Sequence, residues 1–293
     1  MGEKKLRYNE IYISPEDKEK IKNLYLSGSS TVKIGQLFGF SHKKVARVLE
    51  ELCIPRTGVG RRKYQLDECY FDEIDTPNKA YILGFLCADG TNNRDKGTVS
   101  MALEEGDFDI LEKIRKEIKS ERELEFLDYS NKHDFGYTYK NQYRLLLFSS
   151  HICDSLINLG VVPNKSLILE FPEIKEDLLH HFIRGVFDGD GSVYQGKIKT
   201  QFTLTITSTD SFCNTLKCIT EKFVGINCHI YDASNHNGIT KVFTISGRNQ
   251  VKKFMDWMYN DADLFLQRKY DRYLNYFYNI NNSLSEERTD KVI

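Results

Sequence analysis

Residues 80–90 read AYILGFLCADG, and residues 181–191 read HFIRGVFDGDG. Both segments have the apolar character of a buried helix, both carry small residues four positions apart, and both end in an aspartate followed by a glycine. The two final aspartates, Asp89 and Asp190, stand 101 residues apart. A repeat of this length predicts that the chain contains two lobes of the same architecture.

The small residues of the repeat predict how the lobes meet. Gly84 lies four positions before Ala88, and Gly185 lies four positions before Gly189. Residues spaced by four share one face of a helix, and small residues on that face let two helix backbones approach closely. We therefore expect the two repeated helices to pack against each other and to form the interface between the lobes.

The same packing would bring the two aspartates together. Gly90 and Gly191 are of the residue type that most easily adopts the left-handed C-terminal cap, so each helix is expected to end at its aspartate. A carboxylate there faces the negative end of the helix dipole, and two such groups repel each other. A divalent cation would relieve this repulsion, and oxygen ligands suit Mg²⁺. The pair therefore predicts a site for metal-assisted phosphodiester hydrolysis.

The run DGDGS at residues 188–192 also has the composition of a calcium loop. An EF-hand loop needs glycine at its sixth position and glutamate at its twelfth, where this chain has Val193 and Lys199. The EF-hand interpretation therefore fails.

Strand-like and helical patterns alternate after each copy of the repeat. After the first copy, strand patterns cover 98–103, 123–129 and 143–148, and helical patterns cover 108–118 and 152–159. After the second copy, strand patterns cover 201–207, 228–231 and 242–245, and helical patterns cover 210–224 and 251–259. This order predicts an α+β fold of two pseudo-symmetric lobes, 64–175 and 176–293, each of the type αββαββα.

Residues 1–63 form a separate basic segment. They carry 14 Lys and Arg against 7 Asp and Glu, whereas the whole chain has a net charge of -1. Their helical patterns, the last of which covers 42–49 after a glycine-containing turn, predict a small all-α helix-turn-helix domain. The basic tract at 56–63 would follow a phosphate backbone, so this module is expected to bind DNA.

With both motifs in place, the chain resembles the LAGLIDADG homing endonucleases, in the monomeric form that carries two motifs. The matching residues are Ile82–Gly90 and Ile183–Gly191, and the resemblance spans about residues 70 to 280. It implies a site-specific endonuclease whose two lobes form a saddle over double-stranded DNA and make a staggered cut with 3′ overhangs. Cys87 departs from the acid that the motif usually has, but it lies outside the metal-binding position.

The resemblance also implies a metal site. The last acids of the motifs, Asp89 and Asp190, would bind Mg²⁺ or another divalent cation such as Mn²⁺, and Ca²⁺ would bind without supporting cleavage. In some members the carbonyl before this position, here that of Ala88 or Gly189, also approaches the metal.

Basic and polar residues complete the expected site. Lys165 and Lys269 follow the acids by 76 and 79 residues and would polarise water or stabilise phosphate charge. The alternative is that both are surface lysines. Alternate side chains of the strands would face the groove and read bases. The candidate DNA contacts of both modules are His42, Lys43, Lys44, Arg47, Arg56, Arg61, Arg62, Tyr139, Gln142, Arg144, Lys197, Lys199, Gln201 and Thr203.

Composition sets the remaining limits. The 293 residues are 40% hydrophobic and 28% charged, with 18 Phe and 17 Tyr, which excludes the disordered and collagen-like classes. No apolar run is long enough to span a membrane, and the first residues lack a secretory signal. The seven cysteines are scattered without a CxxC pair. We interpret them as reduced core residues of a cytoplasmic or nucleoid-associated monomer.

Two other functions stay open. An RNA maturase that assists the splicing of intron RNA would share this fold, with or without cleavage. A non-catalytic DNA-binding transcription regulator would also combine the fold with a helix-turn-helix, but in that group the module follows the repeat and the motif acids are lost. Here Asp89 and Asp190 are both present, which favours the endonuclease.

Overall fold

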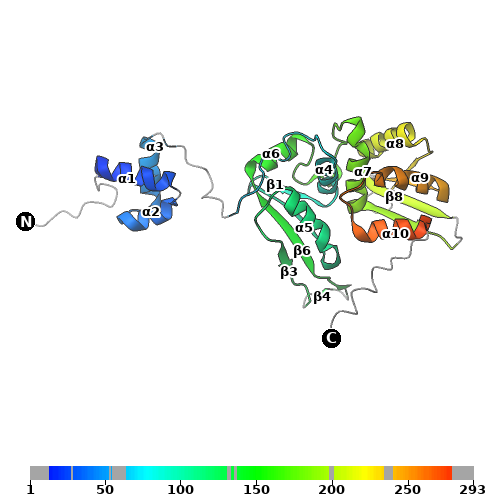
Figure 1. Cartoon of the computed structure of the whole chain (residues 1–293), viewed down its shortest axis with the longest axis horizontal. Helices are drawn as coiled ribbons and strands as arrows, with labels where there is room; N and C mark the ends of the chain where they lie inside the picture. Colours follow the sequence, from blue (N-terminus) through cyan, green and yellow to red (C-terminus); the bar gives the residue numbers. More distant parts are fainter. Residues whose placement is uncertain are drawn as a thin grey trace, which may run out of the picture. The chain divides into compact units, whose positions relative to one another are not determined.

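The computed structural model describes most of the chain, and it divides the chain into two compact units, Met1–Lys63 and Tyr64–Ile293 (Figure 1). The described residues are 13–27, 29–52, 54, 64–130, 133–134, 137–197, 201–233 and 240–278, with the backbone alone for 133–134 and 137–138. None of the helices in these ranges has the length and apolarity needed to cross a bilayer.

The first unit holds three helices, α1 (Pro15–Leu26), α2 (Thr31–Phe38) and α3 (His42–Glu51). A serine precedes each helix, and its hydroxyl accepts a hydrogen bond from the backbone N–H three residues later. The helices enclose a small core made of Ile13, Ile21, Ile34, Val45, Val48 and Leu49.

Two glycines shape the connection between α2 and α3. Gly39 ends α2 in the left-handed conformation, with φ at 69°. Gly35 is buried beneath the turn, where an added Cβ would lie 2.5 Å from the carbonyl oxygen of Phe40. The helix, glycine turn and second helix expected for residues 31–49 are therefore present.

In the second unit, the first lobe places a four-stranded antiparallel sheet beside its motif helix. Its elements are α4 (Pro77–Asp89), β1 (Thr91–Asn93), β2 (Thr98–Glu104), η1 (Glu105–Asp107), α5 (Phe108–Glu117), β3 (Glu125–Leu127), β4 (His133–Asp134), β5 (Tyr137–Thr138), β6 (Gln142–Phe148), α6 (Ser150–Asn158) and η2 (Lys165–Leu167). The sheet has the strand order β1-β2-β6-β3, and β4 pairs only with β5.

The second lobe repeats this plan. Its elements are η3 (Glu176–Leu178), α7 (Leu179–Asp190), β7 (Gly191–Gln195), β8 (Phe202–Thr209), α8 (Asp210–Val224), β9 (His229–Asp232), β10 (Thr240–Ser246), α9 (Arg248–Tyr259) and α10 (Gln267–Tyr278). The sheet order β7-β8-β10-β9 matches that of the first lobe, strand for strand. The α+β fold with two αββαββα lobes is therefore confirmed. The strand patterns missed β1 and β7, the first strand of each lobe, and did not predict the β4–β5 hairpin or α10.

Each sheet has one face under helices and one open face. In β8, residues alternate between buried apolar side chains and more exposed threonines. Helices α8 and α9 pack on β8 and β10, as α5 packs on β2 and β6 in the first lobe. The opposite, more exposed face of each sheet carries three of the candidate base-reading residues, Gln142 and Arg144 in β6 and Thr203 in β8.

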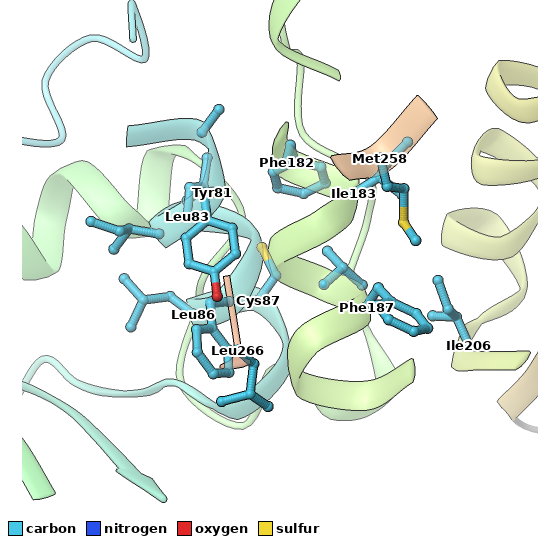
Figure 2. Close-up of a cluster of buried hydrophobic side chains, with 14 of the residues drawn as sticks. Tyr81, Leu83, Leu86, Cys87, Phe182, Ile183, Phe187, Ile206, Met258 and Leu266 are labelled. Atoms are coloured by element: carbon cyan, nitrogen blue, oxygen red, sulfur yellow. The ribbon is translucent and has the colours of Figure 1, made fainter. Parts of the chain in front are cut away.

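The motif helices α4 and α7 lie side by side in the centre of this unit (Figure 1). A Cβ on Gly84 would stand 2.0 Å from the carbonyl oxygen of Phe182, and one on Gly185 would stand 2.0 Å from that of Tyr81. Figure 2 shows the apolar side chains of both helices, Phe182 and Phe187 among them, that fill the surrounding contact. The interface predicted from the small residues is confirmed.

Candidate active site at the lobe interface

The two motif aspartates meet where α4 and α7 end. A Cβ on Gly189, the residue before Asp190, would lie 3.1 Å from the Oδ2 atom of Asp89. Both aspartate side chains are exposed, and neither carboxylate accepts a hydrogen bond from any residue in the described ranges. The junction therefore presents two free oxygen ligands next to each other.

The glycines after the aspartates do not adopt the left-handed cap, so that expectation is wrong. Gly90 has φ -75° and ψ 144°, and Gly191 has φ -83° and ψ 151°, which is extended backbone. The chain passes directly from each helix into a strand. Glycine is needed for space, because a Cβ would lie 2.5 Å from the carbonyl oxygen of Leu86 in one lobe and 2.2 Å from the ring of Phe187 in the other.

The surroundings of the two carboxylates favour their neutral forms. Many protein atoms stand around each side chain at the junction, and this desolvation raises the pKa of Asp89. The same cause, reinforced by the negative charge of Asp89, raises the pKa of Asp190 to about 6. Lys165 and Lys269 act in the opposite direction on both groups. A bound cation would add positive charge beside the two carboxylates and so favour their ionised forms.

Lys165 is buried behind the first acid, with 7% of its surface exposed. Its Nζ donates hydrogen bonds to the carbonyl oxygens of Ala88, at 3.2 Å, and Gly90, at 2.5 Å. These carbonyls belong to the residues on either side of Asp89. Burial lowers the pKa of Lys165.

Lys269 takes the corresponding place in the second lobe. It is 9% exposed, and its Nζ donates to the carbonyl oxygens of Phe187 and Gly191, each at 2.6 Å. Desolvation lowers the pKa of Lys269 to about 8. The alternative that Lys165 and Lys269 are surface lysines is therefore wrong, and their catalytic role stays a prediction.

The position two residues before each acid differs between the lobes. Asp188 is buried and accepts hydrogen bonds from the hydroxyl of Tyr81, at 2.9 Å, and from the amide of Leu266, at 2.7 Å. Burial raises the pKa of Asp188 to about 6. Its counterpart Cys87 is a buried thiol, whose pKa burial raises to about 12. Asp188 therefore joins α7 to α4 and to the segment before α10.

Sequence reasoning missed two polar contributions near the site. Arg184 is fully buried on α7 and donates to the carbonyl oxygens of Met258 and Leu264. Arg268 donates through Nε to both carboxylate oxygens of the buried Asp107, at 3.0 Å each. The only signal for Arg184 was an arginine inside an otherwise apolar motif. No local signal links Arg268 to a partner 161 residues away.

The donor set at the junction fits a hard divalent cation. Two carboxylates are accessible, and the carbonyl of Ala88, although it accepts from Lys165, keeps a second lone pair. Gly189 lies at the helix contact beside Asp89. All of these donors are oxygen atoms, the ligands that Mg²⁺ and Mn²⁺ prefer.

The candidate base-reading residues differ in their placement. Gln142 and Arg144 lie on the open face of β6, and Thr203 lies on that of β8. Arg144 is engaged in an ion pair with Glu125 at 2.8 Å. Three further candidates lie just outside the strands and are at least partly exposed, and these are Tyr139, Lys197 and Gln201. Lys199 lies outside the described residues.

On α3 of the first unit, the buried and exposed faces divide as expected. Val45, Val48 and Leu49 are buried, whereas His42, Lys43 and Arg47 are exposed. Lys44 is half-buried, with its Nζ 4.9 Å from the ring centre of Phe40. Arg56, Arg61 and Arg62 lie outside the described residues.

The cysteines are only in part the core residues that we expected. Cys87, Cys153, Cys213 and Cys228 are buried and free. Cys69 and Cys218 are exposed, because each lies on a surface turn or on the solvent side of a helix. Cys53 lies outside the described residues.

The family model described as a LAGLIDADG-like domain matches residues 177–257. This range contains α7, the complete second sheet, α8 and most of α9. The resemblance first seen in the motifs is thereby confirmed for the second lobe. No curated protein matches the chain.

Several solved structures are similar to the chain at low identity. Full-length DUF199/WhiA from Thermatoga maritima is 15% identical, covers 76% of this chain and 69% of its own, and has a TM-score of 0.43. A study of mesophilic variants of the homing endonuclease I-DmoI gives a structure that is 15% identical, covers 64% and 97%, and has a TM-score of 0.43. The meganuclease I-SmaMI, bound to uncleaveable DNA, is 14% identical, covers 73% and 96%, and has a TM-score of 0.44.

Proposed function

We propose that this protein, whose second lobe is a LAGLIDADG-like domain, is a site-specific endonuclease that makes a metal-dependent, staggered cut in double-stranded DNA. One observation carries the proposal. Asp89 and Asp190 end the two central helices as exposed neighbours without a hydrogen-bond partner in the described residues. Packing gains nothing from two adjacent carboxylates at the negative ends of two helix dipoles, so a ligand that needs them accounts for the pair.

Each acid would serve one DNA strand, because the two lobes repeat the same geometry. A bound Mg²⁺ or Mn²⁺ would activate water and neutralise the charge that develops at the phosphate. Lys165 and Lys269 hold the carbonyl groups around the helix ends and so fix where each acid stands. Their ammonium groups also place positive charge directly behind the site, which favours an approaching phosphate.

A basic pocket adjoins the second acid and supports phosphate binding there. Its volume is about 110 Å³, and Ser192, Arg268, Lys269 and Arg272 are among the residues that line it. Arg268 is oriented by its bonds to Asp107. The open faces of the two sheets would then contact the bases that flank the cut.

The proposal also assigns a role to each domain of the chain. Residues 1–63 would act as a DNA-binding helix-turn-helix module, followed by lobes at 64–175 and 176–293 that work as a cytoplasmic monomer. A maturase would bind intron RNA with the same surfaces. A transcription regulator would bind one DNA site and leave it intact.

A cleavage experiment separates these functions. Incubation with a library of randomised DNA duplexes, with and without Mg²⁺, should enrich one long site whose ends carry 3′ overhangs, only in the presence of Mg²⁺. Sequencing of the cut ends gives the readout. Specific binding without any cut would contradict the nuclease and favour the regulator, and preferential binding of structured RNA would favour the maturase.

Substitution of the acids tests the site itself. Asp89→Asn or Asp190→Asn should abolish the double-strand cut and leave affinity for DNA nearly unchanged, because only the metal ligands are altered. Asp177→Asn, at an exposed aspartate of η3, is the matched control and should cut like the original protein. Full cleavage by either of the first two variants would overturn the assignment.

A further inference from the structure

Three side chains of different chemistry converge on the surface of the first lobe, outside the junction of the motif helices. Cys69 and Asp72 belong to the turn before α4, and His151 lies in the first turn of α6. One thiol sulfur, one carboxylate oxygen and one imidazole nitrogen from these residues all lie within 4.8 Å of one another. The ligand atoms of one tetrahedral Zn²⁺ lie closer together than 4.8 Å, so small rotations of these side chains would let one ion contact all three.

Hydrogen bonds already orient these groups toward a common point. The Nε2 atom of His151 lies 2.7 Å from Oδ1 of Asp72, and the hydroxyl of Ser155, one turn further along α6, donates to the same oxygen at 2.8 Å. The thiol of Cys69 also donates to Asp72. Donors from two separate segments thus meet at one carboxylate.

The turn that carries Cys69 and Asp72 is held firmly. Tyr70 and Phe71, which lie between them, are 5% and 1% exposed and belong to the main hydrophobic core. The amide of Asp72 donates to the carbonyl of Cys69 at 3.0 Å. The ligands are therefore presented by a backbone that the core already fixes, and little order would be lost on binding an ion.

A catalytic cysteine triad does not explain the arrangement. In such a triad the histidine stands between the thiol and the acid, so that it can take the thiol proton. Here Asp72 stands in the middle, and its hydrogen bond with Cys69 raises the pKa of that thiol. A raised pKa is the opposite of the lowered pKa that a nucleophilic cysteine needs.

We propose that Cys69, Asp72 and His151 form a binding site for Zn²⁺ or a chemically similar transition-metal ion. Sulfur and imidazole ligands select zinc over Mg²⁺, which prefers the all-oxygen pair at Asp89 and Asp190. Binding breaks the hydrogen bonds that join His151 and Cys69 to Asp72, releases the thiol proton to solvent and leaves the imidazole proton on Nδ1 of His151. The thiolate, the Nε2 atom of His151 and the carboxylate then each form a bond to the ion. A water molecule completes the tetrahedron, since the site is open to solvent.

The ion would join two parts of the first lobe that are far apart in sequence. It would tie the turn at 68–72 to α6, where the hydroxyl of Ser149 already donates to Glu68 at 3.1 Å. The turn leads directly into α4 and thus into the interface between the lobes. Zinc is therefore expected to stabilise the first lobe rather than to take part in phosphodiester hydrolysis.

Cobalt substitution tests the site on the full chain. Titration with Co²⁺ should give one equivalent bound tetrahedrally, with a thiolate-to-cobalt charge-transfer band that Zn²⁺ abolishes by displacement. Cys69→Ser should remove the band, and His151→Ala should lower the affinity at least about tenfold. Cys218→Ser, which alters the other exposed free cysteine in the described residues, is the matched control. It should keep both the charge-transfer band and the affinity for Co²⁺.

Circular dichroism of each variant checks that it is folded. Where Cys69→Ser does not fold, Asp72→Asn provides the second test, with weaker metal binding expected and the charge-transfer band retained. A band that survives in Cys69→Ser, or Zn²⁺ that leaves the thermal unfolding of the original protein unchanged, would overturn the proposal. The readouts do not depend on nuclease activity, so Asp89→Asn should bind Co²⁺ at this site normally even if no DNA is ever cut.

Discussion

Cys87 and Asp188 occupy the same position of the repeat, two residues before the motif acids, but their surroundings differ. Asp188 is buried and accepts two hydrogen bonds, one of them across the helix interface, whereas Cys87 is a buried thiol near the charges of Lys165 and Asp190. A buried acid is tolerated only where polar groups reach it. Asp89 and Asp190 lack such partners in the described residues, so these two, rather than Asp188, are the acids suited to bind an ion.

His181, on α7, predicts that the second unit loses stability in mild acid. Its side chain is 4% exposed. Burial, together with His180 and Arg184, lowers its pKa to about 3. In the unfolded chain the same group is protonated below about pH 6.5, so the unfolded state binds the extra proton between these two values. The free energy of unfolding should fall as the pH drops through this window, by at most about 1.4 kcal/mol per pH unit.

Urea unfolding of the original protein and of His181→Leu, at about pH 7 and about pH 5, measures this contribution. The variant should lose less stability between the two conditions because it has no proton to gain on unfolding. His229→Leu, at an exposed histidine of β9, is the control and should lose as much as the original protein. Equal losses in all three proteins would contradict the role of His181.

At the scale of elements, the contact between α4 and α7 depends on its glycines. A Cβ on Gly185 would lie 2.0 Å from the carbonyl oxygen of Tyr81 and 2.7 Å from the amide of Phe85, both of them backbone atoms. Since backbone cannot rotate away, Gly185→Ala should force the helices apart and cost roughly 1–3 kcal/mol or more of stability. It should also slow cleavage, because the two acids sit at the ends of these helices.

Gly106→Ala is the matched control for this substitution. An added Cβ there would meet nothing within 4 Å, and its φ is not positive. Urea unfolding and cleavage rate should both stay close to those of the original protein. If Gly185→Ala were as stable and as active as Gly106→Ala, the close approach of the helices would not be what positions the acids.

The elements that were predictable from the sequence are those with a regular apolar period. The small residues of the repeat indicated the α4–α7 contact, and alternation of side chains indicated β2, β6 and β8. Helix α10 was missed although Tyr270, Tyr273, Leu274 and Phe277 stand at helical spacing along it, so the sequence did carry a signal for this helix. Contacts such as Arg268 with Asp107, or Cys69 with His151, join residues distant in sequence. No local pattern could reveal them.

At the scale of the whole molecule, charge is divided between the two units. The first unit carries twice as many basic as acidic residues, whereas the chain as a whole has a net charge of -1. Non-specific affinity for DNA comes mainly from phosphate contacts with lysine and arginine. The first unit should therefore supply much of the salt-dependent binding, while the second unit supplies the cut.

Substitutions on α3 test this division in the full chain. Lys43→Ala and Arg47→Ala remove exposed cations from the face opposite its buried residues. If each contacts one phosphate, the double variant should bind DNA more weakly, and its slope of log affinity against log salt should decrease by about 1.8, since each lost contact contributes about 0.9. Lys20→Ala, at an exposed lysine of α1, should leave the slope unchanged. An unaltered slope in the double variant would show that α3 does not lie on DNA, whereas loss of the slope with retained Mg²⁺-dependent cleavage would confirm that binding and cutting reside in separate units.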